Sequence, residues 1–96
     1  MTKYIMLCNW TDHGIQNVKE SGNRLDKARE LARSLKGELK DFWMTMGQYD
    51  FVVTVDMPDD EAMATFTLRV ASAGAVRSTT LKAFDEPRYR ALTGAV

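Results

Sequence analysis

Strand-like and helical patterns alternate along this chain, and the order of these segments limits the folds open to it. Apolar residues recur with helical spacing in two stretches, and strand-forming residues cluster in four others. A glycine follows each helical stretch, Gly37 and Gly74, and we interpret Gly37 as the left-handed residue that ends the first helix. We expect strands over 3–10, 38–46, 49–57 and 76–84 and helices over 23–36 and 59–73.

This β-α-β-β-α-β order predicts an α+β fold of the ferredoxin-like kind, a four-stranded antiparallel sheet with both helices on one face. Ninety-six residues are enough for one domain, so we expect residues 1–96 to form a single unit. Gly47-Gln48 lies between the two middle strands, and a two-residue link with glycine first predicts a type II′ hairpin. We expect Glu86 to Leu92 to form a short C-terminal tail.

The sheet face away from the helices is predicted to be too apolar to face water alone. In the segment 3–10 both faces carry apolar residues, and in 38–46 Leu39 and Trp43 lie on the face opposite to Phe42 and Met44. Large exposed apolar patches mark interaction sites. We therefore predict a homodimer that packs through this sheet face, with the chain's own C-terminal tail as the alternative cover.

Charge and cysteine content narrow the classes of partner. Thirteen basic and thirteen acidic residues cancel, so we expect no nucleic-acid and no membrane partner. The RNA-recognition module has the same order of elements, but Asp50 would repel phosphate in it. The one cysteine, Cys8, cannot form an intrachain disulfide, and no apolar run resembles a signal peptide or a membrane helix. We expect a cytoplasmic protein.

The run Gly47-Gln48-Tyr49-Asp50-Phe51-Val52-Val53 resembles the signature of the GYD domain family, which is named for such a Gly…Tyr-Asp segment. The segment Thr11-Asp12-His13-Gly14-Ile15 is similar to the family's Thr-x-x-Gly turn, and Thr79-Thr80-Leu81-Lys82-Ala83-Phe84 to its Thr-rich last strand. The resemblance covers nearly the whole chain. It implies a ferredoxin-like subunit of the dimeric α/β-barrel superfamily, and it implies no particular reaction.

Few side chains are suited to acid–base chemistry. His13 is the only imidazole, and Asp50 lies at the start of the third strand, so we take both as candidate catalytic residues. The alternatives are that His13 belongs to a capping turn and that Asp50 binds backbone N–H groups or pairs with Arg77 or Lys82. One histidine and one cysteine are too few for a typical metal site, so we predict no metal and no cofactor.

Three residues near the middle of the chain, Trp43, Met44 and Tyr49, are the candidate ligand-binding residues, because they are suited to lining a pocket for an apolar molecule. The first helix also carries several basic residues. They alternate with Asp26 and Glu30, so we interpret this face as solvated and ion-paired, not as a binding patch.

Two functions are consistent with these patterns. The first is a dimeric small-molecule-binding or interaction module without catalysis. The second is a cofactor-independent enzyme, of isomerase, decarboxylase or oxygenase type, that acts on a small hydrophobic metabolite with His13 or Asp50 as proton carrier. A cavity of roughly 300 Å³ or more, lined by Trp43, Met44, Tyr49 and a titratable group, would favour the enzyme.

Overall fold

The computed structural model describes residues 1–96, which form four strands, four α-helices and one short 3-10 helix. The main elements follow the predicted order, and short helical segments precede the first long helix and follow the last strand. The bounds are β1 Thr2–Trp10, α1 Asp12–Gln16, η1 Val18–Glu20, α2 Ser21–Ser34, β2 Glu38–Met44, β3 Phe51–Met57, α3 Asp60–Ser72, β4 Val76–Ala83 and α4 Glu86–Gly94.

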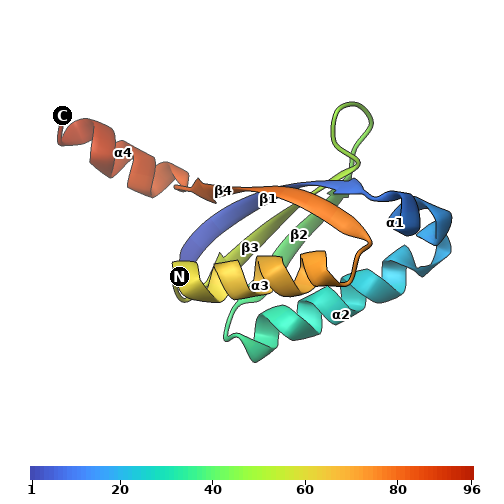
Figure 1. Ribbon diagram of the computed structural model, residues 1–96. Coiled ribbons are helices and arrows are strands. Elements are labelled where there is room, and N and C mark those ends of the chain that lie inside the picture. Colours follow the sequence, from blue (N-terminus) through green and yellow to red (C-terminus); the bar gives the residue numbers. More distant parts are fainter.

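All four strands belong to one antiparallel sheet in the order β2-β3-β1-β4. Both long helices, α2 and α3, lie against the same face of this sheet, and the other face carries no helix (Figure 1). The molecule is therefore thin, measuring 49 × 31 × 17 Å along its principal axes. This arrangement confirms the predicted ferredoxin-like fold.

The core fills the space between the sheet and the two long helices. Alternate residues of β1, namely Tyr4, Met6 and Cys8, point into it and are at most 4% exposed. From α3, Met63 and Phe66 close the core on the helix side. The other buried members of this cluster are Ala32, Leu39, Val53, Val55 and Met57.

Helix α3 begins and ends at residues suited to those places. The carboxylate of Asp59 accepts a hydrogen bond from the Ala62 N–H at 2.8 Å and so caps the first turn. The helix is followed by Gly74, whose φ of 82° lies in the left-handed region that glycine adopts at little cost. This end was predicted correctly.

The end of α2 differs from the prediction. Lys36, not Gly37, adopts the left-handed conformation, with φ of 64°. The Gly37 N–H then donates to the Ala32 carbonyl at 2.9 Å, as in a Schellman motif. Gly37 is needed for a different reason, because a Cβ atom there would collide with the carbonyl oxygen of Asp56. The interpretation of Gly37 as the left-handed residue is wrong.

The predicted two-residue hairpin is also wrong. Strand β2 ends at Met44 and β3 begins at Phe51, so the link is the loop 45–50. The Thr45 N–H donates to the Asp50 carbonyl at 2.9 Å and closes this loop. Asp50 itself is held by β1, because its N–H donates to the Cys8 carbonyl at 2.9 Å. The link between the two strands therefore has six residues, not two.

A register shift between Leu39 and Asp41 interrupts the pairing of β2 with β3. The extra residue in this bulge reverses the alternation of faces along β2. Leu39 therefore points into the core and is 6% exposed, whereas Trp43 lies on the helix-free face and is 64% exposed. The prediction that Leu39 shares a face with Trp43 is wrong. The prediction that Trp43 and Phe42 lie on opposite faces is correct.

Helix α4 leaves the end of β4 and extends away from the sheet and from the other helices (Figure 1). The carboxylate of Asp85 accepts a hydrogen bond from the Arg88 N–H at 3.0 Å and caps it. No residue of α4 is buried, and Tyr89 and Leu92 are 60% and 51% exposed. Neither this helix nor any other has the length and apolar character that crossing a membrane requires.

Candidate functional site

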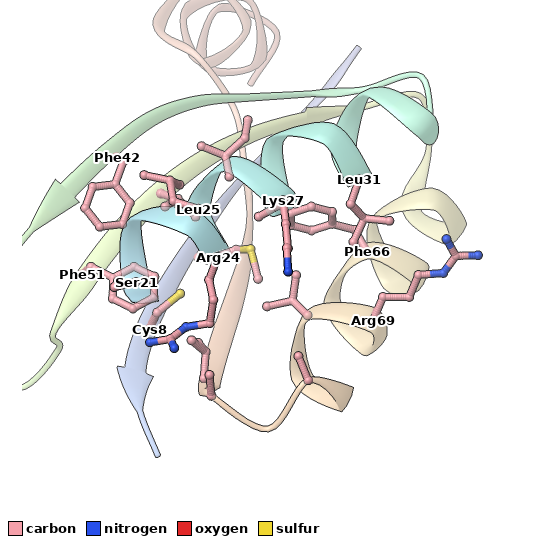
Figure 2. Close-up of a pocket in the computed structure, with 18 of the residues that line it drawn as sticks. Cys8, Ser21, Arg24, Leu25, Lys27, Leu31, Phe42, Phe51, Phe66 and Arg69 are labelled. Atoms are coloured by element: carbon pink, nitrogen blue, oxygen red, sulfur yellow. The ribbon is translucent and has the colours of Figure 1, made fainter. Parts of the chain in front are cut away.

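A cavity of about 200 Å³ lies between the sheet and the pair of helices α2 and α3 (Figure 2). Fifteen of its nineteen lining residues are hydrophobic. Two stacked rings, Phe42 and Phe51, form one wall, with their centroids 5.2 Å apart. Leu25 and Leu31 of α2 face Phe66 of α3 across the cavity. Such a lining favours an apolar ligand.

Three cationic residues also line this cavity, and no acidic residue does. Arg24 donates to the backbone carbonyls of Asn17 and Gly14 at 3.1 and 3.3 Å, so it fixes the turn that leads into α2. Lys27 and Arg69 make no ion pair, because all four ion pairs of the structure lie elsewhere. The opening is therefore basic.

The same pattern corrects the interpretation of α2 as an ion-paired face. Neither Asp26 nor Glu30 forms an ion pair in the structure. Glu20 accepts a hydrogen bond from the Asn23 amide at 2.9 Å instead of pairing with Arg24. The prediction of an ion-paired surface on α2 is wrong, because Glu20 and Arg24 bind an amide and backbone carbonyls, and no opposite charge lies within ion-pair distance of Asp26 or Glu30.

Two polar groups of β1 belong to the cavity wall, and both are removed from water. Burial raises the pKa of the Cys8 thiol to about 12, so the thiol stays neutral. The indole N–H of Trp10 is buried and has no hydrogen-bond partner. A buried donor without an acceptor is costly and rare in folded proteins.

The helix-free face of the sheet carries a second candidate site, an apolar patch of five residues. Across the strands, Trp43 pairs with Val52 and Val52 with Leu7. In the next row Ile5 pairs with Leu81, which is 45% exposed. We call Ile5, Leu7, Trp43, Val52 and Leu81 the sheet-face patch.

Polar pairs border this patch. The Lys3 ammonium lies 3.2 Å from the Asp56 carboxylate on the adjacent strand. Toward the β2 edge, the Thr54 hydroxyl donates to the Asp41 carboxylate at 2.9 Å. An apolar centre with a polar rim is the usual composition of a protein–protein interface.

The candidate catalytic residues are not joined to each other by a hydrogen bond. His13 is exposed on α1, where the Asn17 amide lies 3.4 Å from its Nδ1 atom. The Asp50 carboxylate accepts a hydrogen bond from the backbone N–H of Trp10 at 3.0 Å, which is the backbone-binding alternative considered above. Neither residue lines the cavity. Their catalytic roles stay predictions.

The candidate ligand-binding residues are spread over two regions outside the cavity. Trp43 lies in the sheet-face patch, and Met44 is 68% exposed at the end of β2. Tyr49 lies in the loop 45–50, where its carbonyl accepts a hydrogen bond from the Thr45 hydroxyl at 2.6 Å. Their ligand-binding roles stay predictions as well.

Sequence reasoning missed the residues that line the cavity. One signal was available for Trp10, because it continues the alternation of Tyr4, Met6 and Cys8 and so shares their helix-facing side. Arg24, Lys27 and Leu31 are spaced as one stripe of a helix, which places two cations beside the apolar stripe of α2.

The Thr-x-x-Gly turn has a structural role in this chain. The Thr11 hydroxyl accepts a hydrogen bond from the Gly14 N–H at 3.1 Å and donates to the Gly74 carbonyl at 2.5 Å. Gly14 lies so close to the start of β4 that a Cβ atom would collide with the Ala75 carbonyl oxygen. The motif therefore fastens α1 to the turn between α3 and β4.

The antiparallel sheet, the two helices on one face and the apolar cavity between these layers define a ferredoxin-like α+β domain. Residues 4–93 match the family model described as the GYD domain. The chain belongs to the GYD domain family. This agrees with the resemblance of the segment Gly47 to Val53.

A curated relative from Thermus thermophilus is 31% identical over 84 residues, which cover 86% of this chain and 88% of the relative. It is named glutamine synthetase and cystathionine beta-lyase binding protein. The crystal structure of TTHA0845, also from Thermus thermophilus, is 24% identical with a TM-score of 0.57, covering 88% of this chain and 95% of that one.

The structure of MtbAldR superposes on this chain with a TM-score of 0.69 at 16% identity. The match covers 88% of this chain and 52% of MtbAldR, so the present chain spans about half the length of that protein. At this level of identity the likeness shows the fold alone.

Proposed function

We propose that this protein is a homodimeric interaction module that associates through its sheet-face patch. The observation that carries the proposal is the exposure of Trp43, 64%, in a continuous apolar row with Val52 and Leu7. Contiguous apolar surface of this kind is typical of interaction sites. A second copy is the simplest occupant, because a two-fold axis lets the same patch cover itself.

The chain's own C-terminal segment is a poor cover for this patch. The segment follows β4, which is one edge strand, whereas Trp43 lies on β2, the opposite edge strand. Helix α4 extends away from the sheet (Figure 1). It leaves Leu81, on the preceding strand β4, 45% exposed. This placement favours a second copy over an intrachain cover.

The size of the molecule is compatible with such an interface. A stable interface removes roughly 800 Å² from each partner, about an eighth of the 6591 Å² that this chain exposes. We expect the helix-free face of the four-stranded sheet to supply this area. Burial of a large apolar side chain such as Trp43 contributes about 1.5–3 kcal/mol.

Sedimentation equilibrium of the purified chain tests the dimer. The expected species has twice the 10.9 kDa mass of the chain. The variant Trp43→Asp should weaken association by at least about 30-fold, the effect of losing an interface contact worth roughly 2 kcal/mol. Leu68→Asp is the matched control, because Leu68 is 71% exposed on α3, on the opposite side of the molecule, and should leave the dimer intact.

A circular dichroism melt of each variant shows that the fold is retained, since both substituted side chains are exposed. A wild-type chain that stays at 10.9 kDa across the concentration range would contradict the proposal. Equal association of Trp43→Asp and wild type would assign the dimer to another surface.

The name of the Thermus thermophilus relative supports a further partner, an enzyme bound by the dimer. Glutamine synthetase and cystathionine beta-lyase are the enzymes in that name, and we propose that this chain binds one of them. Surface plasmon resonance with each purified enzyme from the source organism tests this. Saturable binding is expected, and its absence at micromolar concentrations of both enzymes would reject this partner class.

The composition of the cavity favours binding over catalysis. Its lining contains neither a carboxylate nor an imidazole, and its one thiol has a pKa raised to about 12. General acid–base chemistry uses a group whose pKa lies near the working pH. The cofactor-independent enzyme with His13 or Asp50 as proton carrier is therefore the weaker of the two candidate functions.

A further inference from the structure

We propose that the cavity between α2, α3 and the sheet binds a small amphipathic carboxylate, with the apolar body inside and the anionic head at the basic opening. This site is separate from the sheet-face patch, and the proposal does not depend on the dimer. The ligand class follows from the volume of the cavity, from the signs of the charges at its edge and from one buried donor in its wall.

The volume sets the size of the apolar body. The cavity measures about 200 Å³, and its lining is almost entirely hydrophobic. An engineered apolar cavity of about 150 Å³ holds benzene. One aromatic ring or a short alkyl chain therefore fits, between the phenyl groups of Phe42 and Phe51 on one side and Phe66 on the other.

The charges at the edge set the sign of the head group. Figure 2 shows Lys27 extending from α2 toward α3, and Arg69 on that facing helix with its guanidinium directed away from Lys27. Neither residue has a carboxylate partner within the chain. Because no acidic residue lines the cavity, the field at its opening is positive and attracts an anion. Ammonium and guanidinium groups bind carboxylates through charge-assisted hydrogen bonds.

The buried indole N–H of Trp10 supplies an independent observation. Trp10 lines the cavity, and its indole N–H is buried without any acceptor in the chain. Most buried donors in proteins are paired, so an unpaired one in the wall of a cavity indicates an absent acceptor. A water molecule cannot reach this N–H in the structure, so the indole ring must turn toward the cavity for an oxygen of the ligand to pair with it. A purely hydrocarbon ligand would leave this donor unpaired.

Intrinsic fluorescence provides the assay, because the chain has two tryptophans and only Trp10 lines the cavity. In a Trp43→Phe background all indole emission comes from Trp10. Octanoate and phenylacetate are the carboxylate probes, and octanol and phenylethanol are their neutral counterparts. We expect saturable changes in emission and a raised melting temperature with the carboxylates, and at least about tenfold weaker binding of the alcohols.

A pair of variants distinguishes the effect of the basic opening from the effect of the protein's overall charge. The double variant Lys27→Gln/Arg69→Gln should weaken octanoate binding by at least about tenfold. Arg33→Gln is the control, because Arg33 is exposed on the same helix but does not line the cavity, and it should bind octanoate as the background does. Both sets of substitutions lie outside the sheet-face patch, so the sedimentation behaviour of the dimer should not change.

Three results would overturn the proposal. One is the absence of any saturable response to both carboxylates at millimolar concentration. Another is a lack of charge dependence, seen either as equal binding of octanol and octanoate or as equal weakening by Arg33→Gln and by the double variant, since it removes the basic opening as the recognition element. The third is a Trp10 emission that changes with protein concentration in the absence of probe, which would assign the cavity to a segment of a second copy.

Discussion

The Tyr4 hydroxyl donates a hydrogen bond of 2.5 Å to the Asp60 carboxylate, and so ties the start of β1 to the first turn of α3. The Lys82 ammonium donates to the other carboxylate oxygen at 3.2 Å from the neighbouring strand. Burial, together with the hydrogen bond from Tyr4 to the Asp60 carboxylate, raises the pKa of Tyr4 to about 12. The hydrogen bond from Tyr4, together with the one from Lys82, lowers the pKa of Asp60.

The lowered pKa of Asp60 predicts a specific acid sensitivity. The folded state binds the Asp60 proton less readily than the unfolded state does, so the stabilisation is present above the ordinary aspartate pKa of about 3.9 and is lost as pH falls below it. In Asp60→Asn this component should be absent, and the decrease in unfolding free energy between about pH 5 and about pH 2.5 should be smaller than in wild type. Urea unfolding at the two pH values measures it.

Glu61→Gln is the matched control for this measurement, because Glu61 is the next acidic residue in the first turn of α3. It should retain the acid sensitivity of the wild type. Identical pH slopes for wild type, Asp60→Asn and Glu61→Gln would show that the carboxylate between Tyr4 and Lys82 is not linked to stability.

Cys8 is predicted to resist thiol reagents while the protein is folded. The residue is 2% exposed and its pKa is raised to about 12 by burial, so about one thiol in 10⁴ is ionised at pH 8. Reaction with a disulfide reagent should be slow in buffer and complete within seconds in denaturant. Absorbance of the released thiolate follows both reactions. Fast modification of the native chain would mean that β1 opens readily at Cys8.

Two glycines in helices make opposite predictions for the same substitution. In Gly14→Ala the new methyl group would collide with the Ala75 carbonyl, so backbone must move and stability should fall by about 1–3 kcal/mol. In Gly22→Ala nothing lies within 4 Å of the new methyl group, and the better helix propensity of alanine should raise stability by about 0.4–1 kcal/mol. Thermal melts of both variants show whether each melting temperature falls or rises relative to the wild type. A neutral Gly14→Ala would mean that α1 is not packed against Ala75.

The order of the elements was predictable from sequence because each depends on local chemistry. The strand-forming residues over 3–10 give β1, and Asp59 caps α3 through its own side chain. Gly74 ends that helix with a positive φ, as its position indicated. These features need no knowledge of any distant partner.

The features that sequence did not predict depend on contacts between distant segments. The bulge in β2 is held by Thr54, whose hydroxyl accepts a hydrogen bond from the Asp41 N–H at 3.1 Å. The loop 45–50 is held at Asp50 by hydrogen bonds to Cys8 and Trp10, which are distant in the sequence. The cavity lies where two helices meet the sheet, so no single segment reveals it.

Helix α4 gives the last prediction, which rests on the proposed dimer. A helix of nine residues is marginal in water by itself, and α4 buries none of its residues against its own chain. Its apolar residues Tyr89 and Leu92 are more than half exposed, so we expect them to contact the second copy. Tyr89→Ser/Leu92→Ser should therefore weaken the dimer while leaving the melting temperature of the monomer unchanged.

Hydrogen exchange at two protein concentrations tests this directly. The Tyr89 N–H donates to the Asp85 carbonyl at 2.9 Å, and this amide and its neighbours in α4 should exchange slowly only at concentrations where the dimer forms. The β1 amides serve as the internal reference, because strands β3 and β4 flank β1 within each subunit and protect it at either concentration. If the α4 amides exchange equally fast in dimer and monomer, then the helix is not part of the interface, and the sheet-face patch alone holds the two copies together.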